Sequence, residues 1–91
     1  MHIEKSLSGL RNQLEGLLNE RRIVEEQILF QMDVAEEAKT RMLIAETPLA
    51  DRDYRIARDD LDRMHRERDD LSARIVAIRQ DQDRLLDRML G

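Results

Sequence analysis

Apolar residues recur at alternating spacings of four and three from Ile3 to Ala45, through six heptads. A 3.5-residue period kept this strictly is typical of a coiled-coil seam rather than of a general amphipathic helix. Eleven of the 13 seam positions are apolar, and the exceptions are Arg21 and Gln31. The pattern predicts a helix over about residues 3–46, whose seam includes Leu10, Leu14, Leu17, Val24, Ile28 and Met42.

Pro48 ends this first pattern and is the only proline of the chain. A proline inside a helix removes one hydrogen bond, and its ring clashes with the carbonyl four residues earlier. The residue before a proline is pushed out of the α region, so Thr47 suits the N-cap of a new helix that has Pro48 at its first position. The sequence therefore predicts a turn at about 46–48 and a second helix over about 48–90.

The second half repeats the alternating spacing from Tyr54 to Met89, with nine of 11 positions apolar. Its seam includes Leu61, Leu71, Ile75, Ile78 and Leu85, and its polar members are Arg68 and Gln82. If the reversal spans residues 46–53, the two seams pair in one register, from Ala45 with Tyr54 to Leu10 with Met89. This predicts an all-α, two-helix antiparallel coiled-coil hairpin forming a single domain.

The alternative architecture is one long kinked helix in a parallel oligomer. It fits less well, because extending the first seam past Leu49 meets Arg52, Ile56, Asp59 and Arg63, which do not form a seam. The hairpin is therefore the favoured interpretation.

Four polar residues interrupt the seams, and the expected register pairs two of them. Gln31 would lie beside Arg68, and Arg21 would lie opposite Ile78. Buried polar layers commonly fix the register of a coiled coil at some cost in stability. We expect Arg21, Gln31, Arg68 and Gln82 to play this structural part; the alternative is that Arg21 anchors a partner.

Apolar residues also lie off the seams, and a helix that is apolar on more than one stripe is buried on more than one side. The expected register brings Ile23 to the height of Val76, and Leu43 and Ile44 near Ile56. Because a two-helix unit of this size is marginal alone, we expect a homodimer that forms a four-helix bundle; the alternative is a different protein partner. The expected interface residues are Ile23, Leu29, Phe30, Leu43, Ile44, Ile56 and Val76, with Phe30 the strongest candidate hot spot.

Charge and composition exclude several function classes. Neither half of the chain is basic, and the net charge is −4, so we expect no nucleic-acid partner. The absence of cysteine excludes disulfides and thiolate chemistry. No apolar run reaches the length of a bilayer span, which predicts no membrane insertion and a cytoplasmic location.

Candidate catalytic and metal-ligating residues have simpler interpretations. Asp62 and His65 lie three apart on one helix face, but di-iron bundles use paired Glu-x-x-His motifs, which this chain lacks. Acidic pairs such as Glu36-Glu37 have Arg or Lys three or four residues away, as ordinary surface ion pairs do. We therefore expect no catalytic, metal or cofactor-binding residue, and no enzyme activity.

Residues 53–60, with the sequence DYRIARDD, resemble the tip-proximal stretch of bacterial transcript-cleavage factors. That family uses a long antiparallel coiled coil to deliver acidic residues into the secondary channel of RNA polymerase. Its acidic tip positions correspond here to Thr47 and Ala50, so the resemblance brings no functional residues to this chain.

These observations predict a non-enzymatic coiled-coil module that acts as a homo-oligomer in protein interaction, as a scaffold or adaptor, and also binds an unidentified protein. The alternative is a regulator that inserts its hairpin tip into a larger machine, such as RNA polymerase or a secretion apparatus. In that case the functional residues would be those of the tip, Thr47, Pro48, Leu49, Asp51 and Asp53.

Overall fold

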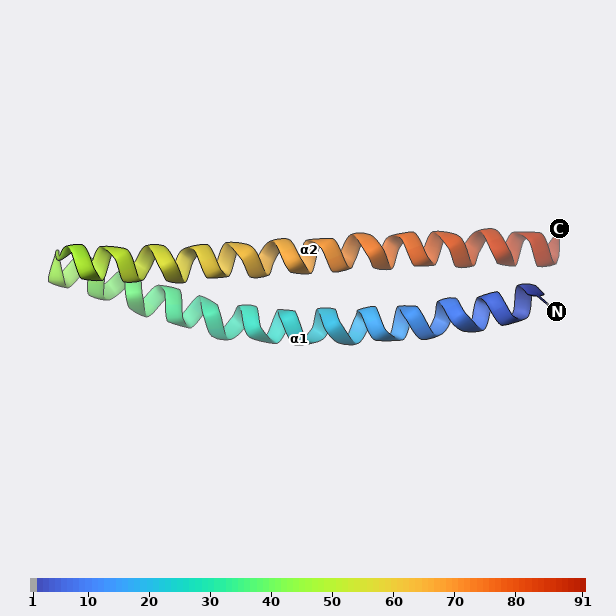
Figure 1. Ribbon diagram of the computed structural model, residues 1–91, viewed down its shortest axis with the longest axis horizontal. Helices are drawn as coiled ribbons and strands as arrows, with labels where there is room; N and C mark the ends of the chain where they lie inside the picture. Colours follow the sequence, from blue (N-terminus) through green and yellow to red (C-terminus); the bar gives the residue numbers. More distant parts are fainter. Residues whose placement is uncertain (1) are drawn as a thin grey trace. The chain divides into compact units, whose positions relative to one another are not determined.

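The computed structural model describes residues 2–91, in which two helices pack against each other and no strand occurs (Figure 1). Helix α1 spans His2–Ala45, which is 44 residues, and helix α2 spans Pro48–Leu90, which is 43 residues. The two helices run antiparallel. The predicted all-α helical hairpin is therefore confirmed.

Two residues, Glu46 and Thr47, connect the helices. Glu46 has a left-handed backbone with φ of 52°, and its N–H donates to the Met42 carbonyl at 3.1 Å, which is a common way to end a helix. The Thr47 Oγ1 accepts a hydrogen bond from the Ala50 N–H at 3.2 Å. This bond caps the first turn of α2, which begins at Pro48.

The left-handed Glu46 gives a testable prediction. For a residue with a side chain this conformation costs about 1 kcal/mol, a cost that glycine does not have. We expect Glu46→Gly to raise the free energy of unfolding by about 1 kcal/mol, measured by urea denaturation. Glu46→Ala is the matched control and should gain nothing; equal effects of the two substitutions would contradict this explanation.

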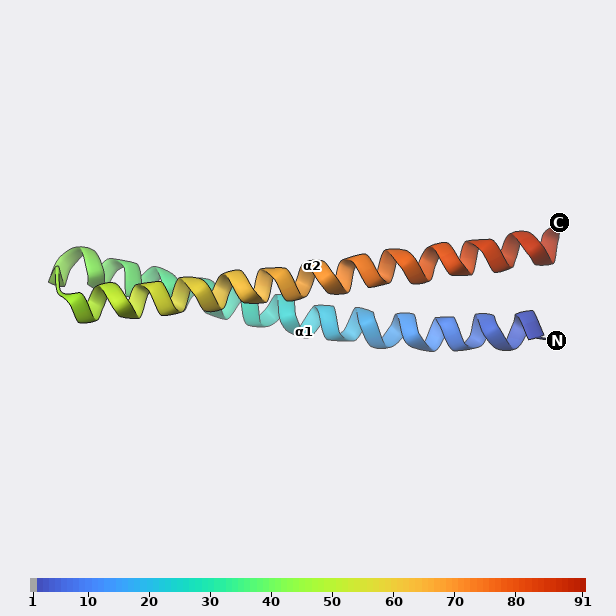
Figure 2. The same cartoon turned by 45° about the horizontal axis from the view of Figure 1, so that its top comes forward.

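Contacts between the helices divide the chain into two compact units. Unit 1 joins the part of α1 up to Arg22 with Asp69–Gly91, and unit 2 is Ile23–Arg68, which includes the turn. In each unit a segment of α1 lies alongside a segment of α2 (Figures 1 and 2). Both units are therefore built from residues distant in sequence.

The core of each unit is thin. In unit 2, Ala35, Ala38 and Ala57 form a buried cluster against which Val34, Tyr54 and Leu61 pack. In unit 1, Leu17, Leu71 and Ile75 are buried, and Ile75 is only 1% exposed. Alanine buries little apolar area, so a few larger side chains supply most of the stabilisation in both units.

The register differs from the predicted one. In unit 2, Ala35 packs with Ala57, whereas its expected partner was Met64; Leu61, the expected partner of Ala38, does pack against the same cluster. In unit 1, Leu10 shares a depression with Asp81 and Leu85 instead of pairing with Met89, and Leu17 shares one with Arg74 and Ile78 instead of pairing with Gln82. Ala35, Leu10 and Leu17 therefore meet α2 residues four to eight positions nearer the turn than predicted.

The length of the turn explains this shift. The predicted register needed a reversal over residues 46–53, but α2 already begins at Pro48. Residues 48–53 therefore join the helix, and Ala50, in its first turns, is partly buried. Because the seam repeats every seven residues, both registers bring apolar positions together.

Candidate interaction surfaces

The seam residues lie between the two helices in each unit. Those buried are Leu17, Val24, Ile28, Leu71 and Ile75, and those partly buried are Leu10, Leu14, Met42, Leu61, Ile78 and Leu85. Two seam positions near the helix ends, Ala45 and Met89, are exposed. The seam is therefore used for contact within the chain, and its partly buried members keep some accessible surface.

The four polar seam residues are partly buried, and two of them make bonds across to α2. The Gln31 Nε2 donates to the Ala57 carbonyl at 3.0 Å, and the Arg21 Nη1 donates to the Ser72 Oγ at 3.3 Å. The predicted Gln31–Arg68 layer is wrong, because the shifted register moves Gln31 toward Ala57. The expected position of Arg21 opposite Ile78 fails for the same reason.

Twelve large apolar side chains are exposed among residues 2–91. They include all seven predicted interface residues, Ile23, Leu29, Phe30, Leu43, Ile44, Ile56 and Val76, and also Met32, Leu49, Leu86, Met89 and Leu90. Phe30 is 72% exposed and Leu29 is 66% exposed. Ile44 lines a depression together with Leu49.

The apolar residues of α1 outside the seam fall on two stripes, because residues three, four or seven apart share a helix face. The Phe30 stripe contains Ile23, Phe30, Val34 and Ile44. The Leu29 stripe contains Leu18, Leu29, Met32 and Leu43. Two of their members, Leu18 and Val34, are partly buried, and the others are exposed. Sequence reasoning found most of these residues but did not separate the two faces, although the heptad positions carry that signal.

The tip of the hairpin carries the second predicted surface. Thr47, Pro48, Leu49, Asp51 and Asp53 are all exposed. Asp51 lies 3.7 Å from Arg55 in an ion pair one turn along α2. A depression of about 320 Å³ beside the turn has Ile44, Ala45, Leu49 and Ala50 in its lining, so the tip is partly apolar.

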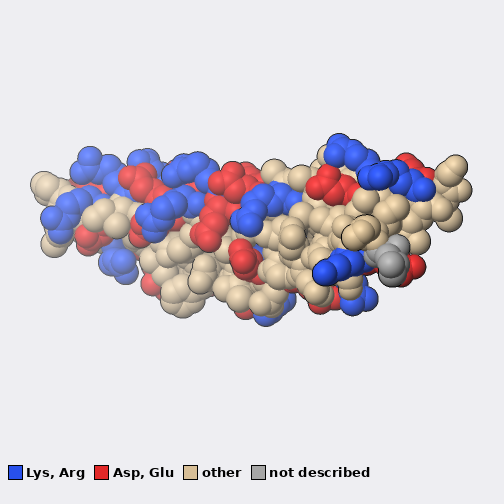
Figure 3. Space-filling model, turned by 45° about the vertical axis from the view of Figure 1, so that its right-hand side comes forward, with Lys and Arg blue, Asp and Glu red and all other residues tan. Residues whose placement is uncertain are grey.

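Acidic and basic side chains are interspersed on the face drawn in Figure 3. Ion pairs such as Arg63–Asp60 and Arg84–Asp81, both 3.0 Å, join residues one turn apart on α2, and exposed pairs of this kind contribute under about 1 kcal/mol each. Net charge differs between the units, however. Unit 1 has eight acidic and eight basic residues and unit 2 has twelve acidic and eight basic, so the net charge of −4 lies wholly in unit 2.

Within residues 2–91, no group of three or more His, Cys, Asp or Glu side chains could hold a metal ion. His65, the histidine singled out in the sequence, is partly buried on α2. Over the same residues, neither helix has a stretch that is both long and apolar enough to span a bilayer.

Comparisons with protein-family models, curated proteins and solved structures find no match to this chain.

Proposed function

We propose that this chain is a non-enzymatic coiled-coil module that acts as a homo-oligomer and serves protein interaction, in the class of scaffolds and adaptors. The observation that carries the proposal is the set of twelve exposed large apolar side chains. Apolar area left in water costs about 25 cal/mol per Å² relative to burial. Large exposed patches on monomers are rare and usually mark interaction sites.

The total accessible surface supports association. The chain exposes 6939 Å², whereas a compact monomer of its mass, 10.8 kDa, exposes about 5,500 Å². The difference, about 1,400 Å², exceeds the ~800 Å² that each partner buries in an interface of standard size. One dimer interface would bring the exposed area per chain close to that of a compact protein.

The thin core supports the same conclusion. Among the described residues only Ile75 combines a large side chain with less than 2% exposure, and three of the eight buried apolar residues are alanines. A small domain with so little buried apolar area commonly gains its stability from disulfides, metals or oligomerisation, and this chain has no cysteine. Association with a second copy would add the burial that the single chain lacks.

Sedimentation equilibrium tests the proposal. We expect the mass of a dimer in the micromolar range and a melting temperature that rises with protein concentration, because association stabilises the folded state by mass action. A fully helical monomer with a concentration-independent melting temperature would contradict homo-oligomerisation.

A second candidate function is insertion of the hairpin tip into a larger machine. The apolar depression beside the turn, with Ile44 and Leu49 in its lining, favours it. For this function, Leu49→Asp should abolish capture of a partner from a lysate while the homodimer remains intact. Unchanged capture by that variant would remove the tip from consideration.

A further inference from the structure

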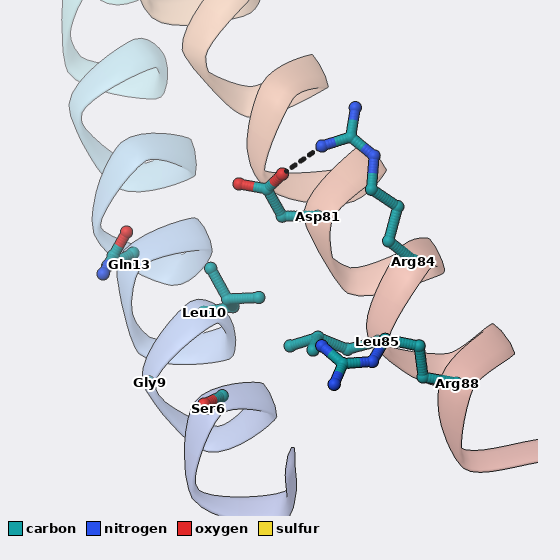
Figure 4. A pocket seen from close by; sticks show the side chains of 8 residues that line it. All are labelled: Ser6, Gly9, Leu10, Gln13, Asp81, Arg84, Leu85 and Arg88. Carbon is teal, nitrogen blue, oxygen red and sulfur yellow. Dashed lines mark hydrogen bonds and ion pairs between the residues drawn. The ribbon is translucent and has the colours of Figure 1, made fainter. Parts of the chain in front are cut away.

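A groove runs between α1 and α2 in unit 1. It consists of two adjoining depressions, of about 600 and 490 Å³, which share Gln13. Leu10 and Leu85 point toward each other in the first (Figure 4), and Leu17 and Ile78 line the second. The apolar lining of this unit 1 groove comes from seam residues that the chain itself covers incompletely.

Gly9 and Gly16 keep this groove open on its α1 side. A Cβ built at either glycine meets nothing within 4 Å, so the packing of α1 against α2 does not require them. Each glycine costs about 1 kcal/mol relative to alanine in a helix interior. A cost of this kind is explained where another backbone or side chain approaches closely.

The Phe30 stripe occupies the same heptad position as the two glycines. Ile23, Phe30 and Ile44 follow Gly16 at one, two and four heptads, and all three are exposed. Unit 1 therefore has glycine at this heptad position, where unit 2 has three large apolar side chains and Glu37. One chain therefore carries both the unit 1 groove and the Phe30 stripe, whose apolar side chains could fill a groove of this kind.

Net charge favours contact between unlike units. Unit 1 is neutral, and unit 2 carries the whole net charge of −4. Packing the unit 2 segments of two copies together would place like charges side by side, which opposes association. Packing unit 1 of one copy against unit 2 of another avoids that repulsion.

Local charges agree with this pairing. Arg74, Arg88 and Glu20 line the unit 1 groove without a hydrogen-bond or ion-pair partner among residues 2–91, so these three carry a net positive charge. Asp33, Glu36 and Glu37 line a depression in unit 2 within two turns of Phe30 on α1, and over those residues their carboxylates are likewise unpaired. Facing charges of opposite sign steer and orient association more than they strengthen it.

We propose that the unit 1 groove receives the Phe30 stripe of a second copy of this chain. The two α1 helices then run antiparallel, and each copy supplies one groove and one stripe about a twofold axis. This inference rests on the proposed homo-oligomer and identifies the surfaces that make it.

Filling the groove tests the contact. Gly9→Leu/Gly16→Leu should raise the dimer dissociation constant at least tenfold, measured by sedimentation, even though leucine favours helix more than glycine does. The matched control is Ser8→Leu/Glu15→Leu, which adds two leucines one heptad apart at exposed positions on another face of α1 and should change the constant less than threefold. A dissociation constant unaffected by the glycine substitutions would overturn the proposal.

Cross-linking tests the orientation, since the chain has no cysteine of its own. Gln13→Cys, at the groove, is mixed with a size-tagged Gln27→Cys, near Phe30, and treated with a bismaleimide. Antiparallel packing predicts cross-links mainly between the two variants. If cross-links instead form mainly between two copies of the same variant, the α1 helices pack in parallel, and the proposal is overturned.

The two levels of inference can fail separately. A monomeric native chain would remove both the homo-oligomer and this contact. Suppose that the native chain is a dimer, that the glycine substitutions leave its dissociation constant unchanged, and that cross-links form between two copies of the same variant. The homo-oligomer would then stand, and only the proposed contact would be overturned. Loss of binding to a different protein in the glycine variant, with self-association unchanged, would also overturn it.

Discussion

Phe30→Asp is expected to dissociate the oligomer into helical monomers, with an increase of at least a hundredfold in the dissociation constant. Phe30 is exposed in the single chain, so the substitution removes no contact that holds α1 against α2. In the proposed dimer the new carboxylate would be buried against Leu10 and Leu85, and an unpaired buried charge costs several kcal/mol. Sedimentation gives the dissociation constant, and circular dichroism reports whether the helices persist.

Leu29→Asp is the matched control for this experiment. Leu29 precedes Phe30, has a similar exposure and receives the same new charge, but it lies on the Leu29 stripe. We expect its dissociation constant to stay within a few-fold of the native value. Equal dissociation by both variants would mean that general charge repulsion, and not the Phe30 stripe, controls association.

Ile75→Ala is expected to lower the free energy of unfolding by about 3 kcal/mol, because removing a buried isoleucine side chain loses its transfer energy and leaves a cavity. Ile75 is the most completely buried large side chain among the described residues. Small proteins are stable by only about 5–15 kcal/mol, so this is a large fraction of the total. Urea denaturation at fixed protein concentration measures the loss.

Val76→Ala provides the comparison for Ile75→Ala. Val76 is the next residue of α2 and is 53% exposed, and surface substitutions usually change stability by no more than about 0.5 kcal/mol. A loss from Ile75→Ala as small as that from Val76→Ala would show that Ile75 is not part of a packed core.

The helices and their boundary could be predicted because they depend on local features. The alternating spacing from Ile3 to Ala45 indicates a helix with one apolar seam, and Thr47 with Pro48 marks where the next helix starts. Both signals require only neighbouring residues. The antiparallel arrangement then followed from the presence of two seams on one chain.

Register could not be predicted from the seams, because seam positions recur every three or four residues and more than one register therefore brings apolar positions together. The predicted register pairs Tyr54 with Ala45, whereas in the structure Tyr54 packs against the alanine cluster that contains Ala38. Only the length of the turn distinguishes the two solutions. The N-cap at Thr47 contained that information, since a helix starting at Pro48 leaves room for a two-residue connection.

The candidate surfaces were predictable in part. Phe30 was expected to lie outside the seam because its heptad position is not a seam position, and it is exposed. The groove beside Gly9 and Gly16 was not foreseen, because its lining combines residues of α1 and α2 that only the correct register brings together. What a surface binds also depends on a second molecule, which one sequence does not contain.

The two-residue turn between Ala45 and Pro48 has a consequence for how the chain folds. Unit 2 contains the turn and joins segments that are close in sequence, whereas unit 1 joins the two ends of the chain. Closing a longer loop costs more conformational entropy, and the segments of unit 1 are separated by a longer stretch of chain than those of unit 2. We therefore expect unit 2 to form first and the helices to pair in unit 1 afterwards. The segments that form the groove are then the last to become ordered and the first to open.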